Sequence, residues 1–303
     1  MSTENLTPDV AKEIAVGETA SGEKFRRRDE RSPWMSVLLH GGLLIALIWS
    51  LVPPIWAILT SLKPNDQAIT TELKIISDPS LNNYVYVLTD TDLPRWFLNS
   101  IIVAFFTMLI GIFLSATAGY AVSRFRFPGH KQLMWSFLIT QMFPMAILIV
   151  PIYNIFARLG LLNSLGGLVL AYCTTAVPFC AWMLKGYFDT IPIEIDEAGR
   201  IDGLTPFGTF WRLVLPLARP GLAVTAFYTF LTAWGEVAYA SAFLTSDSKK
   251  TLAVGLQTFV GQFKTEWGYL TAAGVLVTIP AVIVFLLVQK NLVAGLTAGG
   301  TKG

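Results

Sequence analysis

Residues capable of acid–base, metal or nucleophilic chemistry are few in this sequence and lie far apart. Glu236 is the one formally charged residue within a long apolar run, and a carboxylate in that setting is a candidate for accepting hydrogen bonds or a proton from a ligand. His40 and His130 show no metal-ligand spacing with Cys, Asp or Glu. Cys173 and Cys180 stand seven residues apart on one predicted helix, farther than a disulfide allows, so we interpret both as packing residues. The sequence therefore predicts neither a catalytic centre nor a metal site.

The C-terminal glycines resemble a nucleotide-binding loop only superficially. Gly295 and Gly300 have the spacing of the glycines in G-x-x-x-x-G-K-[ST], but Thr301 occupies the lysine position. Lys302 is followed by Gly303, where such a loop would have to open a helix. We therefore expect no cofactor bound by this chain, and no ATP hydrolysis by this device.

The elements that must position Glu236 and its neighbours are long apolar segments. The 303 residues are 53% hydrophobic and 14% charged, whereas soluble domains are about one quarter charged. A membrane helix needs ~20 mostly apolar residues to cross the bilayer. Six stretches qualify: 34–59, 98–123, 132–157, 162–184, 220–244 and 268–288. The sequence predicts an all-α integral membrane protein with six transmembrane helices, and a net charge of +2 gives no reason to expect a nucleic-acid partner.

The distribution of Lys and Arg predicts the orientation. If the N-terminus is cytoplasmic, fifteen of the 22 Lys and Arg residues fall on the cytoplasmic side and seven on the outer side. Cytoplasmic loops carry the excess of positive charge, so we expect a multi-pass protein of the cytoplasmic (inner) membrane with both termini inside. The expected parts are a disordered tail 1–31, a first span 32–62, a periplasmic loop 63–97, a five-helix core 98–290 with a cytoplasmic loop 188–219, and a cytoplasmic tail 291–303.

Prolines inside the predicted spans leave two interpretations open. Membrane helices tolerate Pro where neighbouring helices satisfy the freed backbone groups. The resulting bends either shape a pathway between helices or are ordinary kinks. The residues are Pro53, Pro54, Pro144, Pro151, Pro178 and Pro280.

The cytoplasmic loop has the pattern of two short helices. Acidic residues follow Pro192, as a helix N-terminus favours, and Gly203 is a helix stop. Thr205 and Pro206 then have the types expected of an N-cap and a first helical residue. Beyond them an apolar stripe recurs at helical spacing, at Phe207, Phe210, Trp211 and Val214. A stripe facing the cytoplasm must pack on something; the alternative is an amphipathic helix lying on lipid headgroups.

The same loop resembles the EAA signature of ABC importer permeases. Glu197-Ala198-Gly199, three residues, Gly203, nine residues and Leu213-x-Leu215-Pro216 reproduce its spacing, with Gly199 in place of Ala and Leu213 in place of Ile. The resemblance implies the type I importer permease fold and a coupling helix that docks on a cytoplasmic ATPase subunit. The coupling residues it implies are Glu197, Ala198, Gly199, Asp202, Gly203, Leu215 and Pro216.

Over about residues 85–303 the sequence is also similar to the MalG-type permeases of maltose and maltodextrin importers. The similar segments are Trp234-Gly-Glu236, Thr251-Leu-Ala-Val-Gly-Leu-Gln257 and the C-terminal run from Gly295. The resemblance implies that the tail reaches between ATPase subunits and that the loop 257–267, where this sequence is divergent, probes a periplasmic binding protein. The implied tail contacts are Gly299, Gly300, Thr301 and Lys302, and the implied loop contacts are Gln257, Phe259, Gln262 and Trp267.

These resemblances lead to an expected function. The chain would be the non-catalytic permease subunit of a binding-protein-dependent sugar importer working by alternating access, with maltose or maltodextrin as first candidate and trehalose as another. Its expected partners are a homologous MalF-like permease, two MalK-like ATPase subunits that bind ATP and Mg, a periplasmic sugar-binding protein, the sugar and membrane lipid.

The substrate path is the least defined part of this expectation. Trp234, Glu236 and Tyr228 are candidates because aromatic rings stack on sugars and carboxylates accept hydroxyl hydrogen bonds. Interfacial aromatic belts and a hydrated Glu236 near the end of the fifth span explain the same residues. A different class of protein, an ion-coupled carrier with Glu236 as its proton site, stays open as the alternative.

Overall fold

The computed structural model describes residues 33–68, 79–261 and 265–300, and of 292–300 it describes the backbone alone. The tail 1–31, for which the sequence predicts disorder, lies outside the described residues. The chain divides into two compact units, Met1–Pro54 and Ile55–Gly303.

The described part of the first unit is apolar helix. Helix α2 (Pro33–Ser61) begins here, and its side chains up to Pro54 are largely exposed, with Leu43 66% and Trp49 80% exposed. A helix of this length with exposed apolar side chains is suited to lipid, as the expected first span requires. Pro53 and Pro54 lie inside the helix without ending it.

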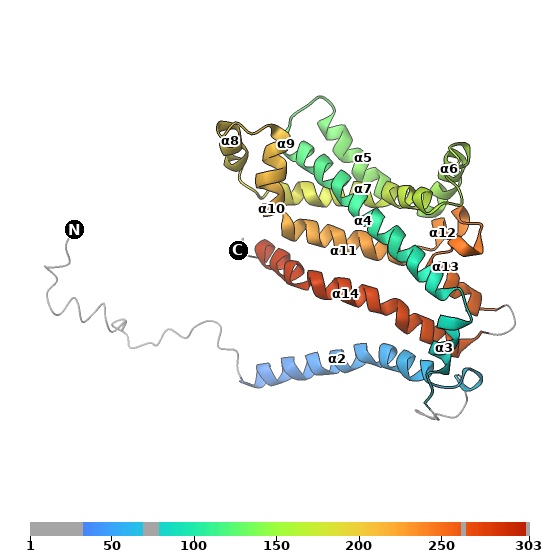
Figure 1. Cartoon of the computed structure of the whole chain (residues 1–303). Coiled ribbons are helices and arrows are strands. Elements are labelled where there is room, and N and C mark those ends of the chain that lie inside the picture. The colour runs from blue at the N-terminus through green and yellow to red at the C-terminus, as the bar shows by residue number, and fades with distance from the viewer. Residues whose placement is uncertain (1–32, 69–78, 262–264, 301–303) are drawn as a thin grey trace, which may run out of the picture. The chain divides into compact units, whose positions relative to one another are not determined.

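Helices make up nearly all of the second unit (Figure 1). After the end of α2 come η1 (Asn65–Gln67), α3 (Asn82–Thr89), α4 (Leu93–Arg124), α5 (His130–Met142), α6 (Met145–Arg158), α7 (Leu165–Phe188), α8 (Glu194–Ile201), α9 (Pro206–Thr209), η2 (Phe210–Val214), α10 (Leu215–Leu217), α11 (Arg219–Trp234), α12 (Ala238–Phe243), η3 (Asp247–Lys249), α13 (Leu252–Gly255), η4 (Leu256–Phe259) and α14 (Trp267–Gly300). Among the described residues the only β-pairing is an isolated bridge between Val260 and Thr265.

Small residues let the central helices approach one another closely. Helix α4 lies along α7 and α11, and α11 lies along α14 (Figure 1). A Cβ added to Gly119 of α4 would lie 2.9 Å from the carbonyl oxygen of Ala181 on α7, so only Gly fits this crossing. The hydroxyl of buried Ser115 on α4 donates to the carbonyl of Val177 on α7 at 3.2 Å. Small side chains and interhelical hydrogen bonds are the means by which membrane helices associate.

Buried apolar side chains form two clusters in this unit. The larger joins α4, α7 and α11 to α12 and α13. The smaller lies at the opposite end of α4, where the cytoplasmic loop predicted from the sequence returns to the bundle. Its members are Ala116, Tyr120, Leu184, Phe188, Ile191, Phe210, Val214 and Ala218.

The expected third span is broken, contrary to the sequence prediction of one helix over 132–157. Helices α5 and α6 meet at a bend of 107°. Phe143 is extended at the break, and Pro144 follows it. A proline disfavours helical backbone at the residue before it and has no N–H to continue the helical hydrogen bonds. Four described helices are long and apolar enough to span a membrane, or six segments if each of two bent pairs counts as one span.

The fifth span also departs from the prediction of one helix over 220–244. Helix α11 ends at Trp234, and α12 begins only at Ala238. At the other end, α11 meets the preceding 206–217 segment at a bend of 82°. The second and sixth spans run longer than expected: α4 begins at Leu93 inside the predicted loop 63–97, and α14 continues as helix to Gly300 through the predicted tail.

Candidate functional site

The loop 188–219, which the sequence predicts to be cytoplasmic, forms two short helical segments joined by a tight turn, as expected. We call residues 194–217 the coupling element, after the role that the EAA resemblance implies. Gly203 ends the first segment with φ +79°, a backbone conformation that residues with a Cβ rarely adopt. The Thr205 hydroxyl oxygen then accepts from the backbone N–H of Gly208 at 3.1 Å and caps the second segment, with Pro206 next in the chain.

The apolar stripe of the second segment divides between two environments. Phe210 and Val214 are buried in the smaller apolar cluster, 2% and 0% exposed. Phe207 and Trp211 stay more than half exposed and stack on each other, with ring centroids 6.3 Å apart. The backbone from 210 to 214 is π-helical, a distortion that occurs frequently at functional sites. The buried pair anchors the segment, and the exposed pair is available for contact.

The structure explains why Gly replaces Ala at position 199. A Cβ there would lie 2.7 Å from the Thr209 hydroxyl oxygen and 3.0 Å from the Leu213 side chain. The first segment therefore packs directly against the second through its Gly199 face. Close packing across this turn makes the coupling element one body.

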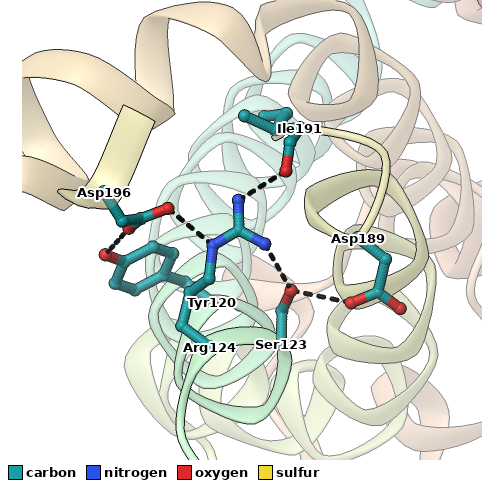
Figure 2. Close-up of polar contacts among 6 residues, drawn as sticks. All are labelled: Tyr120, Ser123, Arg124, Asp189, Ile191 and Asp196. Atoms are coloured by element: carbon teal, nitrogen blue, oxygen red, sulfur yellow. Dashed lines mark hydrogen bonds and ion pairs between the residues drawn. The ribbon is translucent and has the colours of Figure 1, made fainter. Parts of the chain in front are cut away.

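A buried ionic network fastens α8 to α4 (Figure 2). The Arg124 Nε donates to Asp196 Oδ2 at 2.7 Å, and the Tyr120 hydroxyl donates to Asp196 Oδ1 at 2.5 Å. The two charged side chains are only 6% and 4% exposed. Charge-assisted hydrogen bonds of this kind are about twice as strong as neutral ones, and burial limits screening by salt.

The network extends to the end of α7. Arg124 also donates to the backbone carbonyl of Ile191 at 2.9 Å and to the Ser123 hydroxyl at 3.3 Å. Ser123 in turn donates to Asp189 at 2.7 Å, as Figure 2 shows. One guanidinium thus joins α4, the chain after α7 and the coupling helix α8. This role was not predicted from the sequence, where Arg124 is one of the fifteen basic residues expected on the cytoplasmic side and Asp196 is one of the acidic residues that follow Pro192.

The remaining surface of the coupling element faces outward. Glu197, Ala198 and Asp202 are exposed, and Ile201 is 87% exposed. Of the other residues implied by the EAA resemblance, Gly203 and Pro216 are exposed, Leu215 is half-buried and Gly199 is buried. This face therefore presents one exposed apolar side chain, Ile201, beside the carboxylates of Glu197 and Asp202.

The three residues expected along a substrate path lie in different surroundings. Trp234 is 6% exposed, stacks on Phe230 and donates its indole N–H to the carbonyl of Val277 at 3.2 Å, so it is a core residue. Glu236 accepts from the backbone N–H groups of Tyr239 at 2.8 Å and Ala240 at 3.1 Å, and so caps α12.

Tyr228 lines a cavity instead. This cavity has a volume of about 370 Å³ and lies where the break between α5 and α6 faces α7 and α11. We call it the break cavity. Its lining residues are Thr140, Gln141, Phe143, Met145, Leu148, Ile152, Thr174, Thr175, Ala176, Tyr228 and Thr232. Sequence reasoning missed all of them except Tyr228, because a hydropathy window cannot locate a break between helices.

The segments expected to meet other subunits are described only in part. Gln257 and Trp267 are exposed and Phe259 is buried, whereas Gln262 lies outside the described residues. Gly299 and Gly300 belong to the last turn of α14, and Thr301 and Lys302 are not described. Within the described ranges no group of three or more His, Cys, Asp or Glu side chains could hold a metal ion.

Comparison with known proteins assigns the family. Residues 109–298 match the model of the binding-protein-dependent transport system inner membrane component. The chain belongs to this family. The match includes the coupling element and the break cavity.

Relatives of this transport component match most of its length. It is 36% identical over 282 residues to a maltodextrin transport system permease protein, MalD, of Streptococcus pneumoniae, covering 92% of this chain and 98% of that one. It is 34% identical over 279 residues to the sulfoquinovosyl glycerol transport system permease protein SmoH of Agrobacterium fabrum, covering 90% and 98%. A solved bacterial ABC transporter that imports the acidic polysaccharide alginate has the same fold, with a TM-score of 0.75, 22% identity and coverage of 88% and 99%.

The family settles what kind of component this is. It is a multi-pass inner-membrane permease with the ABC importer permease fold, and it is not an enzyme. The coupling element and the break cavity both lie within the segment that the family model matches.

Proposed function

We propose that this chain is one of two permease subunits of an ATP-driven importer of uncharged oligosaccharides, with maltose and maltodextrins as first candidates and trehalose as the alternative. The other partners are a homologous, MalF-like permease, two MalK-like ATPase subunits that hold ATP and Mg, and a periplasmic binding protein that delivers the sugar. Both termini are cytoplasmic.

One observation carries this proposal: the coupling element is fastened to the membrane helices while its outer face stays free. Asp196 joins it to α4 through Arg124 and Tyr120. Phe210 is buried beside Tyr120, and the centroids of their two rings are 4.8 Å apart. A movement imposed on the exposed residues around Ile201 is therefore passed to α4. A surface helix lying on lipid would need no such buried fastening.

The sugar class rests on chemistry together with the relatives. The S. pneumoniae relative is named for maltodextrin, whereas the A. fabrum relative is named for a sulfonated sugar glycerol. The break cavity of this chain is lined without any Lys, Arg, Asp or Glu. Carrying an anionic sugar through lipid depth would call for a cationic partner. An uncharged sugar fits the chain better.

The test is uptake by the complete assembly reconstituted in liposomes, with maltose-loaded binding protein outside and ATP inside. We expect the native assembly to take up maltose only when ATP is present. The Gly203→Val assembly should lose both maltose uptake and the ATP hydrolysis that the binding protein stimulates. A β-branched residue is strained at φ +79°, so the turn of the coupling element changes. Gly160→Val is the matched control, because Gly160 also has positive φ, +67°, with open space around it, but lies between α6 and α7.

Equal loss for both variants would contradict the coupling role. Native uptake driven by a proton gradient without ATP would favour the carrier alternative that uses Glu236. Its capping of α12 argues against that alternative, since both carboxylate oxygens already accept backbone N–H groups. Attachment of the tail and of the loop near Trp267 to their proposed partners is tested separately, by crosslinking from Lys302 and Gln257.

A further inference from the structure

The turn between α4 and α5 carries two basic side chains that the coupling element does not use. Arg126 and Lys131 are exposed, whereas Arg124 is buried in the ionic network on Asp196. Neither Arg126 nor Lys131 forms an ion pair in the part of the chain that the structure describes. We call residues 125–132 the basic turn. Because Arg124 binds Asp196, the basic turn lies at the end of the bundle where α8 lies (Figure 1).

The basic turn encloses a pocket of about 460 Å³ without a carboxylate in its lining. This volume is in the range of pockets for small ligands. The His130 ring closes the turn, since its Nε2 donates to the carbonyl of Val122 on α4 at 2.7 Å. The lining residues are Arg126, Phe127, Gly129, His130, Lys131 and Gln132.

The first turn of α5 adds N–H donors to the two cations. Gly129 stands at the N-cap with φ +88° and has no side chain to cap the helix. The first N–H groups of a helix have no partner inside it. The N–H of His130 donates to the carbonyl of Phe127 at 3.2 Å, and those of Lys131 and Gln132 belong to the same first turn. Together with the two cations, these donors favour an anion with several acceptor oxygens, such as a phosphate group.

One face of α5 continues from the basic turn in the order of the parts of a phospholipid. Trp135, Leu138 and Ile139 follow Lys131 at helical spacing, so they share its face. They are 64%, 38% and 48% exposed. Along this face a positive charge is followed by an aromatic ring and then by aliphatic side chains. A lipid presents the complementary order of headgroup, interface and acyl chains, and Trp is enriched at the interface.

We propose that the basic turn binds the headgroup phosphate of an anionic phospholipid, whose acyl chains lie along the Trp135 face of α5. Basic pockets at the ends of membrane helices are suited to such headgroups. A zwitterionic lipid also has a phosphate, but its own positive group opposes the two cations. The proposal adds a lipid partner to the importer and does not depend on which sugar is moved.

Photo-crosslinking in the complete assembly identifies the occupant. The probe is Gln132→p-benzoylphenylalanine, on the wall of the pocket. The membrane is made of equal parts of phosphatidylglycerol, which is anionic, and phosphatidylcholine, which is zwitterionic. Mass spectrometry then measures the adducts of each lipid. Ile283→p-benzoylphenylalanine is the matched control probe, because Ile283 is 51% exposed within the apolar run 281–288 of α14 and reports the bulk lipid.

The expected selectivity follows from the two charges. Each basic side chain near a membrane surface strengthens the binding of anionic lipid about fivefold, so phosphatidylglycerol adducts should exceed phosphatidylcholine adducts by about twenty-five-fold at 132. The two adducts should be equal at 283. Arg126→Gln and Lys131→Gln should each lower the ratio about fivefold, and together they should bring it to about one. Lys290→Gln should leave it unchanged, because Lys290 is the single basic residue of α14 and lies outside the basic turn.

Three results would overturn the proposal. Equal adducts of both lipids at 132 would mean that lipid touches the turn without selection. Adducts to another subunit in place of lipid would mean that protein covers the turn. An excess of phosphatidylglycerol that survives the double substitution would place the selectivity elsewhere. Crosslinking needs an assembled complex but no transport, so each of these results leaves the importer function intact, and an assembly that moves no maltose leaves the lipid site standing.

Discussion

Replacing Asp196 by Asn should loosen the coupling element without removing it. The change keeps the shape of the side chain but removes the charge that balances Arg124, which is only 6% exposed. The Tyr120 hydroxyl also loses the charged oxygen to which it donates at 2.5 Å. The packing of Phe210 and Val214 is untouched, so the second segment of the coupling element should stay in place.

The size of the effect follows from burial. Breaking a buried ion pair by removing one partner costs about 3–5 kcal/mol, because the remaining charge stays buried without compensation. We take the lower value, about 3 kcal/mol, because the Asn side chain keeps a carbonyl oxygen that can still accept a hydrogen bond. A loss of about 3 kcal/mol in the free energy of local opening corresponds to a rise of roughly 150-fold in the opening equilibrium.

Hydrogen exchange of the backbone amides in 194–201, measured by mass spectrometry on the full assembly, reports this opening. We expect exchange faster by about one hundredfold in Asp196→Asn. Asp189→Asn is the matched control, since Asp189 pairs with Lys185 at 2.5 Å in a partly exposed position where such pairs contribute at most about 1 kcal/mol. Exchange in Asp196→Asn that is no faster than in Asp189→Asn would refute the fastening role of the network.

Two further substitutions test packing and capping. Gly255→Ala should lower the free energy of unfolding by about 1–3 kcal/mol, because the new Cβ would lie 2.2 Å from the Trp96 ring. A thermal melt in detergent measures this loss. Gly274→Ala is the control and should not lower the free energy of unfolding, because the space around Gly274 is open. Glu236→Gln should lower the free energy of unfolding by about 1 kcal/mol, since the amide keeps one acceptor for the N–H groups of α12. Uptake by this variant should still be driven by ATP, and dependence on a proton gradient would contradict this.

The turn of the coupling element could be predicted from sequence because its signals are local. Gly203, Thr205 and Pro206 each restrict the backbone within one or two residues, and the structure confirms the two helical segments they separate. The burial of Phe210 beside the exposed Trp211 was not predictable in the same way. Both belong to one apolar stripe, and only the position of Tyr120 decides which of them is covered.

The breaks near Phe143 and Gly235 were missed for a different reason. A hydropathy window measures whether a segment is apolar on average, and both predicted spans are predominantly apolar. The direction of the helix axis changes at single residues such as Pro144. The sequence shows these prolines, but membrane helices often tolerate a proline without breaking, as α6 does at Pro151. The break cavity, formed by the first of these breaks, was therefore not predictable as a site.

The fastening network left one sequence signal that could have revealed it. Asp196 and Gly199 are three residues apart, so on a helix they share a face, and a glycine in the middle of a short helix is costly unless that face packs closely. The structure shows that it does, against Thr209. An acid on the packed face of an otherwise polar helix must find a partner, and Arg124, at the end of a predicted span, was one of the cations expected on the same side of the membrane.

These contacts show how an eight-residue helix could carry the mechanical role proposed for it. An isolated helix as short as α8 is not stable in water, so its shape must come from what it touches. Two anchors supply it: the Asp196 network on α4 and the Phe210 packing in the smaller apolar cluster. Tyr120 belongs to both, since its hydroxyl binds Asp196 and its ring contacts Phe210. Because both anchors meet at one residue of α4, the coupling element cannot shift on one anchor without straining the other, and movement of its exposed face must move α4.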